Sequence, residues 1–382
     1  MVKGRRYPLP YGILALLGAF TLLSIASQSS LAEIKIGAMT CLTGALSTFG
    51  VSSVQGAKLA VEEINAAGGI LGQSIQLIVE DNGSKAGETA TITRKLISQD
   101  KVTAILGDLT SSATMEGAPL AQAAKIPLLT PSATNIAITK IGNYIFRSCF
   151  IDPFTGKIMA KFALDNLNAK KAILMTDVKQ DYSIGLADAI GQYFGQNGSG
   201  IAKTFSYSSG DTDFRTQLTD VRMEHPDVVF LPGYYTEAAL ILRQARQLGI
   251  TCPFVGGEGW DSPALIQVAG KAADGNYYTD HFSAADPDPG VQKFVQTYRA
   301  KYGALPDALA ALWYDGARLL ARAIEQAGSA DEARIRDALA ATRGFEGVTG
   351  RISIDENRNA SKSGVILKID NGEPKMVQQI TP

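Results

Sequence analysis

The chain has 382 residues, of which 46% are hydrophobic and 19% are charged, a composition typical of a folded protein with about two domains. Its 36 basic and 37 acidic residues give a formal net charge of -1. This balance argues against partners bound mainly by charge, such as nucleic acid or an anionic membrane.

The first 32 residues have the three parts of a secretory signal peptide. Lys3, Arg5 and Arg6 precede the apolar run 11–26, and a Ser-x-Ala sequence ends at Ala32. The alternative is a membrane-spanning helix, but the run is short for a span and no flanking anchor follows it. No cysteine follows the expected cleavage point, so we expect no lipid anchor. The sequence therefore predicts an exported, periplasmic protein with residues 1–32 removed.

The cysteines and histidines offer little chemistry. Cys41, Cys149 and Cys252 are an odd number, so at least one is free. We interpret all three as buried thiols and leave one disulfide pair open. No cysteine spacing resembles a metal site, and only His225 and His281 are present. We therefore expect no metal and no cofactor.

From residue 33 onward, strand-like and helix-like segments alternate. The first series predicts strands at 33–39, 74–80, 102–107 and 126–130, with helices at 51–69, 86–99 and 112–124. The second series predicts strands at 171–177, 201–207, 227–233 and 252–257, with helices at 182–195, 212–223, 237–249 and 262–270. Such series form parallel sheets with helices on both faces. The fold class is therefore α/β, with two Rossmann-like lobes around a cleft.

The rest of the chain does not continue the alternation. Residues 286–344 read as three helices with no sheet of their own. A strand follows at 350–355, and 364–380 reads as a hairpin whose turn is Asn371-Gly372.

A cluster of hydroxyl side chains follows the strand at 102–107. Thr110, Ser111, Ser112 and Thr114 stand where a helix is expected to begin. One interpretation is helix capping, since Ser and Thr accept hydrogen bonds from the first free N–H groups. The other is an anion site, because the same N–H groups and the helix dipole attract a carboxylate or phosphate.

The remaining strand ends favour the second interpretation. A ligand of an open parallel sheet binds beyond the carboxyl ends of the strands. In the first series these ends carry hydroxyls, whereas in the second they carry Tyr182, Tyr234, Tyr235, Glu258 and Trp260. Hydroxyls and N–H groups suit a carboxylate, an acid suits an ammonium, and aromatic rings suit an apolar side chain. The alternative for Glu258 is that it caps the helix at 262–270.

Read in order, several stretches resemble one protein family. They are "GAMTCLTGALSTFG", "GAKLAVEEINAAGGILG", "GDLTSSAT", "TPSATN", "DYSIGLA", "GYYTEAALILRQARQLG" and "GGEGWDSPAL". Together they are similar to the type I periplasmic binding proteins, specifically the Leu/Ile/Val-type amino-acid-binding components of ABC importers. The resemblance covers nearly the whole chain after residue 32.

The resemblance implies a ligand site. The side chains of Ser111 and Thr134 would hold the α-carboxylate of an amino acid. The main-chain carbonyl of Ser132 and the carboxylate of Glu258 would hold its α-ammonium, and Tyr182 would close over it from the second lobe.

The resemblance also implies a side-chain pocket lined by Phe49, Tyr234 and Tyr314. For Tyr314 the alternative is a core position on a helix. Relatives can carry a disulfide near the first hydroxyl cluster, and this chain has Thr110 there instead.

The family implies that the chain crosses between the lobes three times. We expect crossings near 151–152, near His281 and near 348–349. The N-terminal lobe would then hold 33–150 and 283–347, and the C-terminal lobe 151–282 and 348–382.

The expected function is that of a monomeric, non-enzymatic binding protein. It would close around one branched-chain or other neutral amino acid and deliver it to the ABC permease subunits in the membrane. Two alternatives stay open: a ligand-sensing subunit of a regulatory system on the same fold, and an exported α/β enzyme using Glu258 as a base.

Overall fold

The structure is a computed structural model that describes residues 1–5, 8, 33–197 and 199–381. The predicted signal peptide thus lies almost wholly outside the described residues. Within the described part of the chain, no helix is long and apolar enough to span a membrane.

The first sheet has five parallel strands in the order β2-β1-β3-β4-β5. The strands are β1 Ile34–Thr40, β2 Ile75–Asp81, β3 Ala104–Gly107, β4 Leu128–Thr130 and β5 Ile145–Arg147. The helices between them are α1 Ser47–Ala66, α2 Glu88–Lys95 with a π-helical turn at Leu96–Asp100, α3 Ser111–Ala124 and α4 Ala137–Lys140.

Both faces of this sheet are buried, because alternate residues of each strand enter different cores. Ile36 and Leu106 belong to the core that contains α1. Met39 and Ile105 belong to the core that contains Ile92 of α2 and Ala118 of α3. Burial on two faces is the reason that parallel strands read as continuous apolar runs.

The second sheet has seven strands in the order β15-β14-β10-β9-β8-β6-β7. Its parallel strands are β6 Lys171–Asp177, β7 Gly200–Tyr207, β8 Val228–Phe230, β9 Phe254–Gly256 and β10 Tyr277–Asp280. The antiparallel hairpin β14 Gly364–Asp370 and β15 Glu373–Ile380 completes it, with the predicted turn at Asn371-Gly372. Its helices are α5 Asp152–Asn166, α6 Asp181–Gln196, α7 Arg215–Glu224, α8 Tyr235–Gln247 and α9 Pro263–Ala269, and short 3-10 turns lie at Glu258–Trp260 and Gly270–Ala273.

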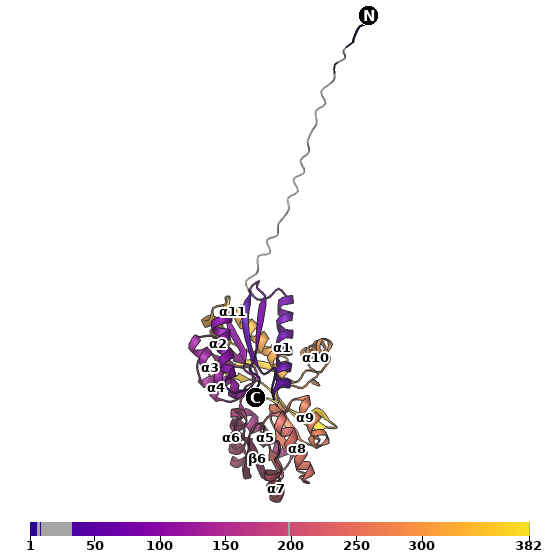
Figure 1. Cartoon of the computed structure of the whole chain (residues 1–382). Helices are drawn as coiled ribbons and strands as arrows, with labels where there is room; N and C mark the ends of the chain where they lie inside the picture. Colours follow the sequence, from indigo (N-terminus) through magenta and orange to yellow (C-terminus); the bar gives the residue numbers. More distant parts are fainter. Residues whose placement is uncertain (6–7, 9–32, 198, 382) are drawn as a thin grey trace. The chain divides into compact units, whose positions relative to one another are not determined.

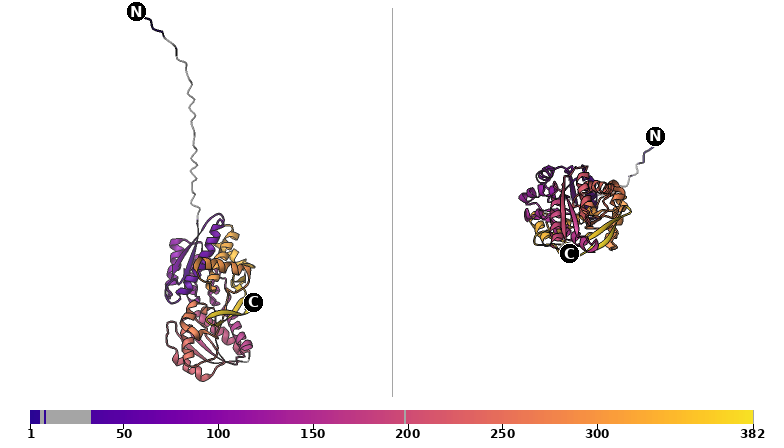
Figure 2. Two further views of the ribbon diagram at one scale, coloured as in Figure 1. Left: turned by 90° about the vertical axis from the view of Figure 1, so that its right-hand side faces the viewer. Right: turned by 90° about the horizontal axis from the view of Figure 1, so that it is seen from below.

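The last three helices return to the first sheet. They are α10 Pro289–Tyr302, α11 Ala308–Ala327 and α12 Glu332–Ala340. Helix α11 packs along α1 and contacts β3 and β4, while α10 contacts α1 (Figures 1 and 2). This packing explains why no strands accompany these helices in the sequence. We call the first sheet with its helices and α10–α12 the first half, and the second sheet with α5–α9 the second half.

A small sheet follows α12, with strands β11 Phe345–Gly347, β12 Gly350–Ile354 and β13 Ala360–Ser361. The turn between β12 and β13 is hydrogen-bonded to the first half. The Arg147 N–H donates to the Arg358 carbonyl at 3.2 Å, and the Arg358 guanidinium donates to the Thr139 carbonyl at 2.7 Å. Residues 350–361 therefore lie against the first half, beyond the predicted crossing at 348–349.

The predicted α/β fold with two helix-flanked sheets is confirmed. The sequence interpretation missed α4, α5, β5, β10, β11 and β13. All three cysteines are free: Cys41 and Cys149 are buried and Cys252 is half-buried.

Candidate functional site

A small cavity of about 20 Å³ lies between the two halves. Seven of the eight predicted binding residues line it: Phe49, Ser111, Ser132, Thr134, Tyr182, Tyr234 and Glu258. The sequence interpretation missed the other three lining residues, Leu109, Gly259 and Leu309. The volume holds about one water molecule and is too small for an amino acid in this structure.

The parallel strands bring these residues together. Ser111 follows β3 and Ser132 follows β4, whereas Tyr182 follows β6 and Glu258 follows β9. Each therefore stands just beyond the carboxyl end of a strand, where the edges of the two sheets meet. This is the position in which open α/β sheets bind ligands.

The hydroxyls after β3 have different roles. Thr110 caps α3, with its Oγ1 accepting from the Ala113 N–H at 3.4 Å. Thr114 Oγ1 donates to the main-chain carbonyls of Asp108 and Thr110, and so serves the backbone. Ser111 is the one that lines the cavity, at the N-terminus of a 14-residue helix whose dipole favours an anion.

Ser132 and Thr134, which both follow β4, have different surroundings. The Ser132 hydroxyl is already engaged: it donates to the Leu109 carbonyl at 3.0 Å and accepts from Trp313 Nε1 at 3.3 Å. The buried Thr134 hydroxyl has no hydrogen-bond partner among the described residues. Thr134 therefore retains a polar group to offer a ligand.

Glu258 is the acidic residue that lines the cavity. Its side chain is buried, and neither carboxylate oxygen has a hydrogen-bond partner in the part of the chain that the structure describes. Burial raises the pKa of this carboxyl to about 8, the charge of Asp152 raises it further, and the nearby Thr134 and Tyr182 hydroxyls oppose the rise. A buried, unpaired carboxylate is costly, and a cation placed beside it would remove that cost.

The capping alternative for Glu258 is wrong. Helix α9 is capped by Ser262, whose Oγ accepts from the Ala264 N–H at 3.2 Å. Glu258 instead begins the short 3-10 turn before it, with its side chain on the cavity.

Aromatic rings close the cavity. The rings of Tyr182 and Tyr234 stack with centroids 5.2 Å apart, and Phe49 meets Tyr234 edge to face at 6.2 Å. The Tyr182 hydroxyl accepts from the Gly259 N–H at 3.3 Å. A Cβ at Gly259 would lie 2.4 Å from the Gly233 carbonyl oxygen, so only glycine allows this approach.

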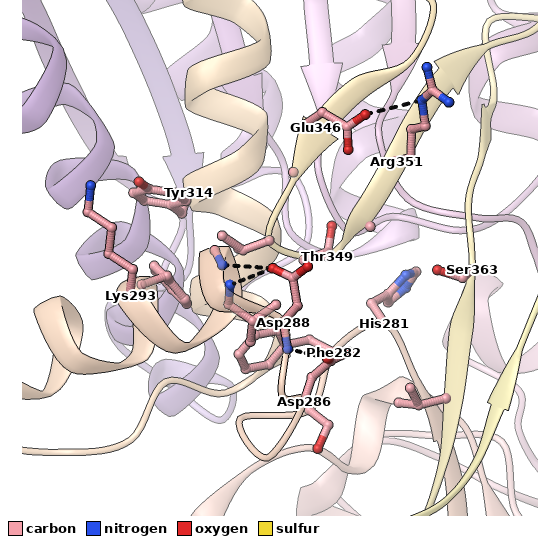
Figure 3. A pocket seen from close by; sticks show the side chains of 18 of the residues that line it. His281, Phe282, Asp286, Asp288, Lys293, Tyr314, Glu346, Thr349, Arg351 and Ser363 are labelled. Atoms are coloured by element: carbon pink, nitrogen blue, oxygen red, sulfur yellow. Dashed lines mark hydrogen bonds and ion pairs between the residues drawn. The ribbon is translucent and has the colours of Figure 1, made fainter.

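Tyr314 is not brought to this cavity. Its ring packs against Phe294 at 4.7 Å, and its hydroxyl donates to Glu63 at 2.5 Å. It lines a separate cavity of about 530 Å³ together with Lys293 and Arg351 (Figure 3). These contacts favour the core interpretation of Tyr314.

The described residues contain no group of three or more His, Cys, Asp or Glu side chains that could hold a metal ion.

Comparisons with known proteins agree with this architecture. The sequence matches the periplasmic binding protein family over residues 33–374. It is 29% identical over 343 residues to the leucine-, isoleucine-, valine-, threonine- and alanine-binding protein of Pseudomonas aeruginosa, covering 89% of this chain and 91% of the relative.

Two solved structures are also similar. The leucine binding protein LivK of Thermotoga maritima is 40% identical with a TM-score of 0.88, covering 91% of this chain and 99% of its own. The branched-chain amino acid transporter substrate binding protein LivJ of Streptococcus pneumoniae, in complex with isoleucine, is 38% identical with a TM-score of 0.87, covering 92% of this chain and 100% of its own. With two helix-flanked parallel sheets meeting at a cavity and a family match over residues 33–374, the chain belongs to the periplasmic binding proteins.

Proposed function

We propose that this protein is the substrate-binding component of an ABC importer and that it binds a neutral amino acid with an apolar side chain. The observation that carries the proposal is the buried, unpaired carboxyl of Glu258, which lines one cavity together with Thr134 and Ser111. An ammonium beside Glu258 and a carboxylate at the N-terminus of α3 would satisfy both ends of the site. A free α-amino acid carries both charged groups on one carbon atom, its Cα.

The rest of the lining suits an apolar side chain. Phe49, Tyr234, Leu109 and Leu309 surround the cavity, and burial raises the pKa of Tyr234 well above its ordinary value, so its ring stays neutral. The names of the similar proteins mention leucine, isoleucine and valine, whose side chains have this character. We therefore expect branched-chain amino acids to bind best.

We propose that the two halves are lobes that close on the ligand. The predicted lobes were 33–150 with 283–347, and 151–282 with 348–382. Because residues 350–361 are bonded to Thr139 and Arg147, we place the third crossing at 362–363 instead. Contacts made by both lobes exist together only in the closed form, so ligand shifts the population toward it.

The partner and the compartment follow from the family. We propose a periplasmic protein, released from a signal peptide near Ala32, that acts as a monomer and passes its ligand to membrane permease subunits. We also propose that it is not an enzyme, because the family that matches residues 33–374 and the similar relatives are binding proteins.

A thermal-shift screen of the twenty amino acids tests the proposal, with benzoate as an anion that lacks the ammonium. We expect leucine, isoleucine and valine to raise the melting temperature, since ligand at a hundredfold excess over its Kd stabilises by about 2.7 kcal/mol. Benzoate should have no effect. The assignment would be contradicted if benzoate alone raised the melting temperature, or if none of the amino acids raised it.

A further inference from the structure

Three residues that line the cavity from the second half each have a close neighbour in sequence that hydrogen-bonds to the first half. The neighbours are Asp181 for Tyr182, Tyr235 for Tyr234 and Asp261 for Glu258. We call Asp181, Tyr235 and Asp261 the latch residues. None of them lines the cavity.

The Asp181 latch joins the N-termini of α3 and α6. The Ser112 hydroxyl donates to Asp181 Oδ2 at 2.8 Å and accepts from the Asp181 N–H at 3.1 Å. Asn135 Nδ2 donates to the Asp181 main-chain carbonyl at 2.8 Å. Three hydrogen bonds to the first half thus fix Asp181, the residue directly before Tyr182. They also give a role to Ser112, which does not cap α3.

The Tyr235 latch joins the start of α8 to the loop before α1. Its hydroxyl donates to the Ala45 carbonyl at 2.9 Å, and its ring meets Phe49 at 4.7 Å. Tyr235 is buried by these contacts. Its position fixes Tyr234, the preceding residue, against Phe49.

The Asp261 latch reaches the N-terminus of α11. Asp261 Oδ2 accepts from the Ala308 N–H at 2.7 Å, while Oδ1 accepts from the Tyr278 hydroxyl at 3.1 Å. Helix α11 already has its own cap, Asp307, which accepts from the Ala310 N–H at 2.8 Å. A carboxylate from the second half therefore satisfies a further N–H of a first-half helix.

We infer that Asp181, Tyr235 and Asp261 are positioning residues that hold the halves closed, keep Tyr182, Tyr234 and Glu258 over the cavity, and set how long a ligand is retained. As a statement about ligand retention, this rests on the proposed function. The latch bonds break when the halves separate, and a ligand leaves only from the open form. Weaker latches should therefore speed dissociation and leave association, which begins with the open form, nearly unchanged.

The test compares latch variants with matched variants inside one half. Ser112→Ala removes a serine–aspartate pair between the halves, and Ser209→Ala removes the serine–aspartate pair with Asp177 inside the second half. Tyr235→Phe removes a tyrosine–carbonyl bond between the halves. Tyr302→Phe removes the equivalent bond to the Gln55 carbonyl, 3.0 Å long, inside the first half.

Stopped-flow fluorescence with L-leucine gives the rates. We expect each latch variant to dissociate about three- to tenfold faster, the worth of one hydrogen bond, with association within about twofold of the wild type. The affinity ratios among leucine, isoleucine and valine should not change, because the latches do not touch the ligand. Equal dissociation rates in latch variants and wild type, or an equal increase in the matched variants, would overturn the inference.

A second measurement needs no ligand. The hydroxyls of Thr48 and Ser262 lie 3.1 Å apart across the halves, so a Thr48→Cys/Ser262→Cys variant should form a disulfide when the halves close. Adding Ser112→Ala should slow this cross-linking, and adding Ser209→Ala should not. If leucine fails to bind but cross-linking is slowed, the proposed function fails and the latches stand. If leucine binds but the latch substitutions change neither the dissociation rate nor the cross-linking rate, the latch inference fails and the proposed function stands.

Discussion

At the scale of single residues, Glu258 makes the sharpest prediction. Glu258→Ala would leave a ligand ammonium unpaired in a buried site, so affinity for L-leucine should fall by about 3–5 kcal/mol. Glu258→Gln keeps an acceptor oxygen and should lose less. Calorimetric titration measures both, and melting curves of the ligand-free variants check the fold. Affinity of Glu258→Ala within about threefold of the wild type would remove Glu258 from the site.

The pH dependence of binding is a second residue-scale prediction. Burial raises the pKa of Glu258 to about 8, so below that pH the unliganded carboxyl is largely protonated in the closed form. A ligand ammonium favours the ionised form and lowers this pKa, so binding releases a proton. Affinity should therefore rise with pH until the Glu258 carboxyl of the unliganded protein is ionised, and then level off.

Titrations in buffers of different ionisation enthalpy count the released protons. Asp152 is the control, because burial raises its pKa to about 7 as well. Glu258→Gln should abolish most of the pH dependence, whereas Asp152→Asn should leave most of it. Proton uptake on binding, or an unchanged profile in Glu258→Gln, would contradict the account.

The sequence predicted those site residues that stand at strand ends. Ser111, Ser132, Tyr182, Tyr234 and Glu258 stand two to five residues after strands that the apolar runs made recognisable. Leu309 gave no signal, because it comes from a late helix whose packing on the first half depends on tertiary contacts. Tyr314 was misleading for the same reason: nothing in its helical pattern separates a cavity residue from a core residue.

At the scale of elements, α1 and α11 must approach closely to place Phe49 and Leu309 on one cavity. A Cβ at Gly56 of α1 would lie 2.0 Å from the Ala310 carbonyl oxygen of α11. Gly56→Ala should therefore push the helices apart and lower the free energy of unfolding by about 1–3 kcal/mol.

The matched variant is Gly191→Ala on α6, where an added Cβ would meet nothing within 4 Å. It should keep or slightly raise stability, since alanine is the better helix former by up to about 1 kcal/mol. Urea denaturation compares the two. Equal effects would mean that the close approach of α1 and α11 does not limit stability.

Helix α5 shows where element prediction failed. It begins at Asp152 with Pro153 at its first turn, a normal helix start, yet the sequence pattern predicts no element between residues 131 and 170. The helix buries residues on several sides, including Thr155, Ile158 and Met159, and so lacks the one-sided apolar stripe that marks a surface helix. Periodicity alone could not reveal it.

At the scale of the whole molecule, the order of strands and helices in both series was predictable, and the exchange of segments between the halves was only partly so. The family resemblance placed α10–α12 with the first sheet, as the structure does. The third crossing is predicted at 348–349, and we propose 362–363 instead, because the turn at Arg358 is bonded to the first half. Strand β12 reads as a strand of either sheet until its partners are known.

The central claim is that an amino acid closes the two lobes on a site completed by Glu258. Small-angle X-ray scattering with and without saturating L-leucine tests it most directly. The account predicts a smaller radius of gyration for the wild type with leucine, and no compaction of Glu258→Ala at the same leucine concentration. An unchanged scattering profile of the wild type at saturating leucine, with binding verified by calorimetry, would contradict it.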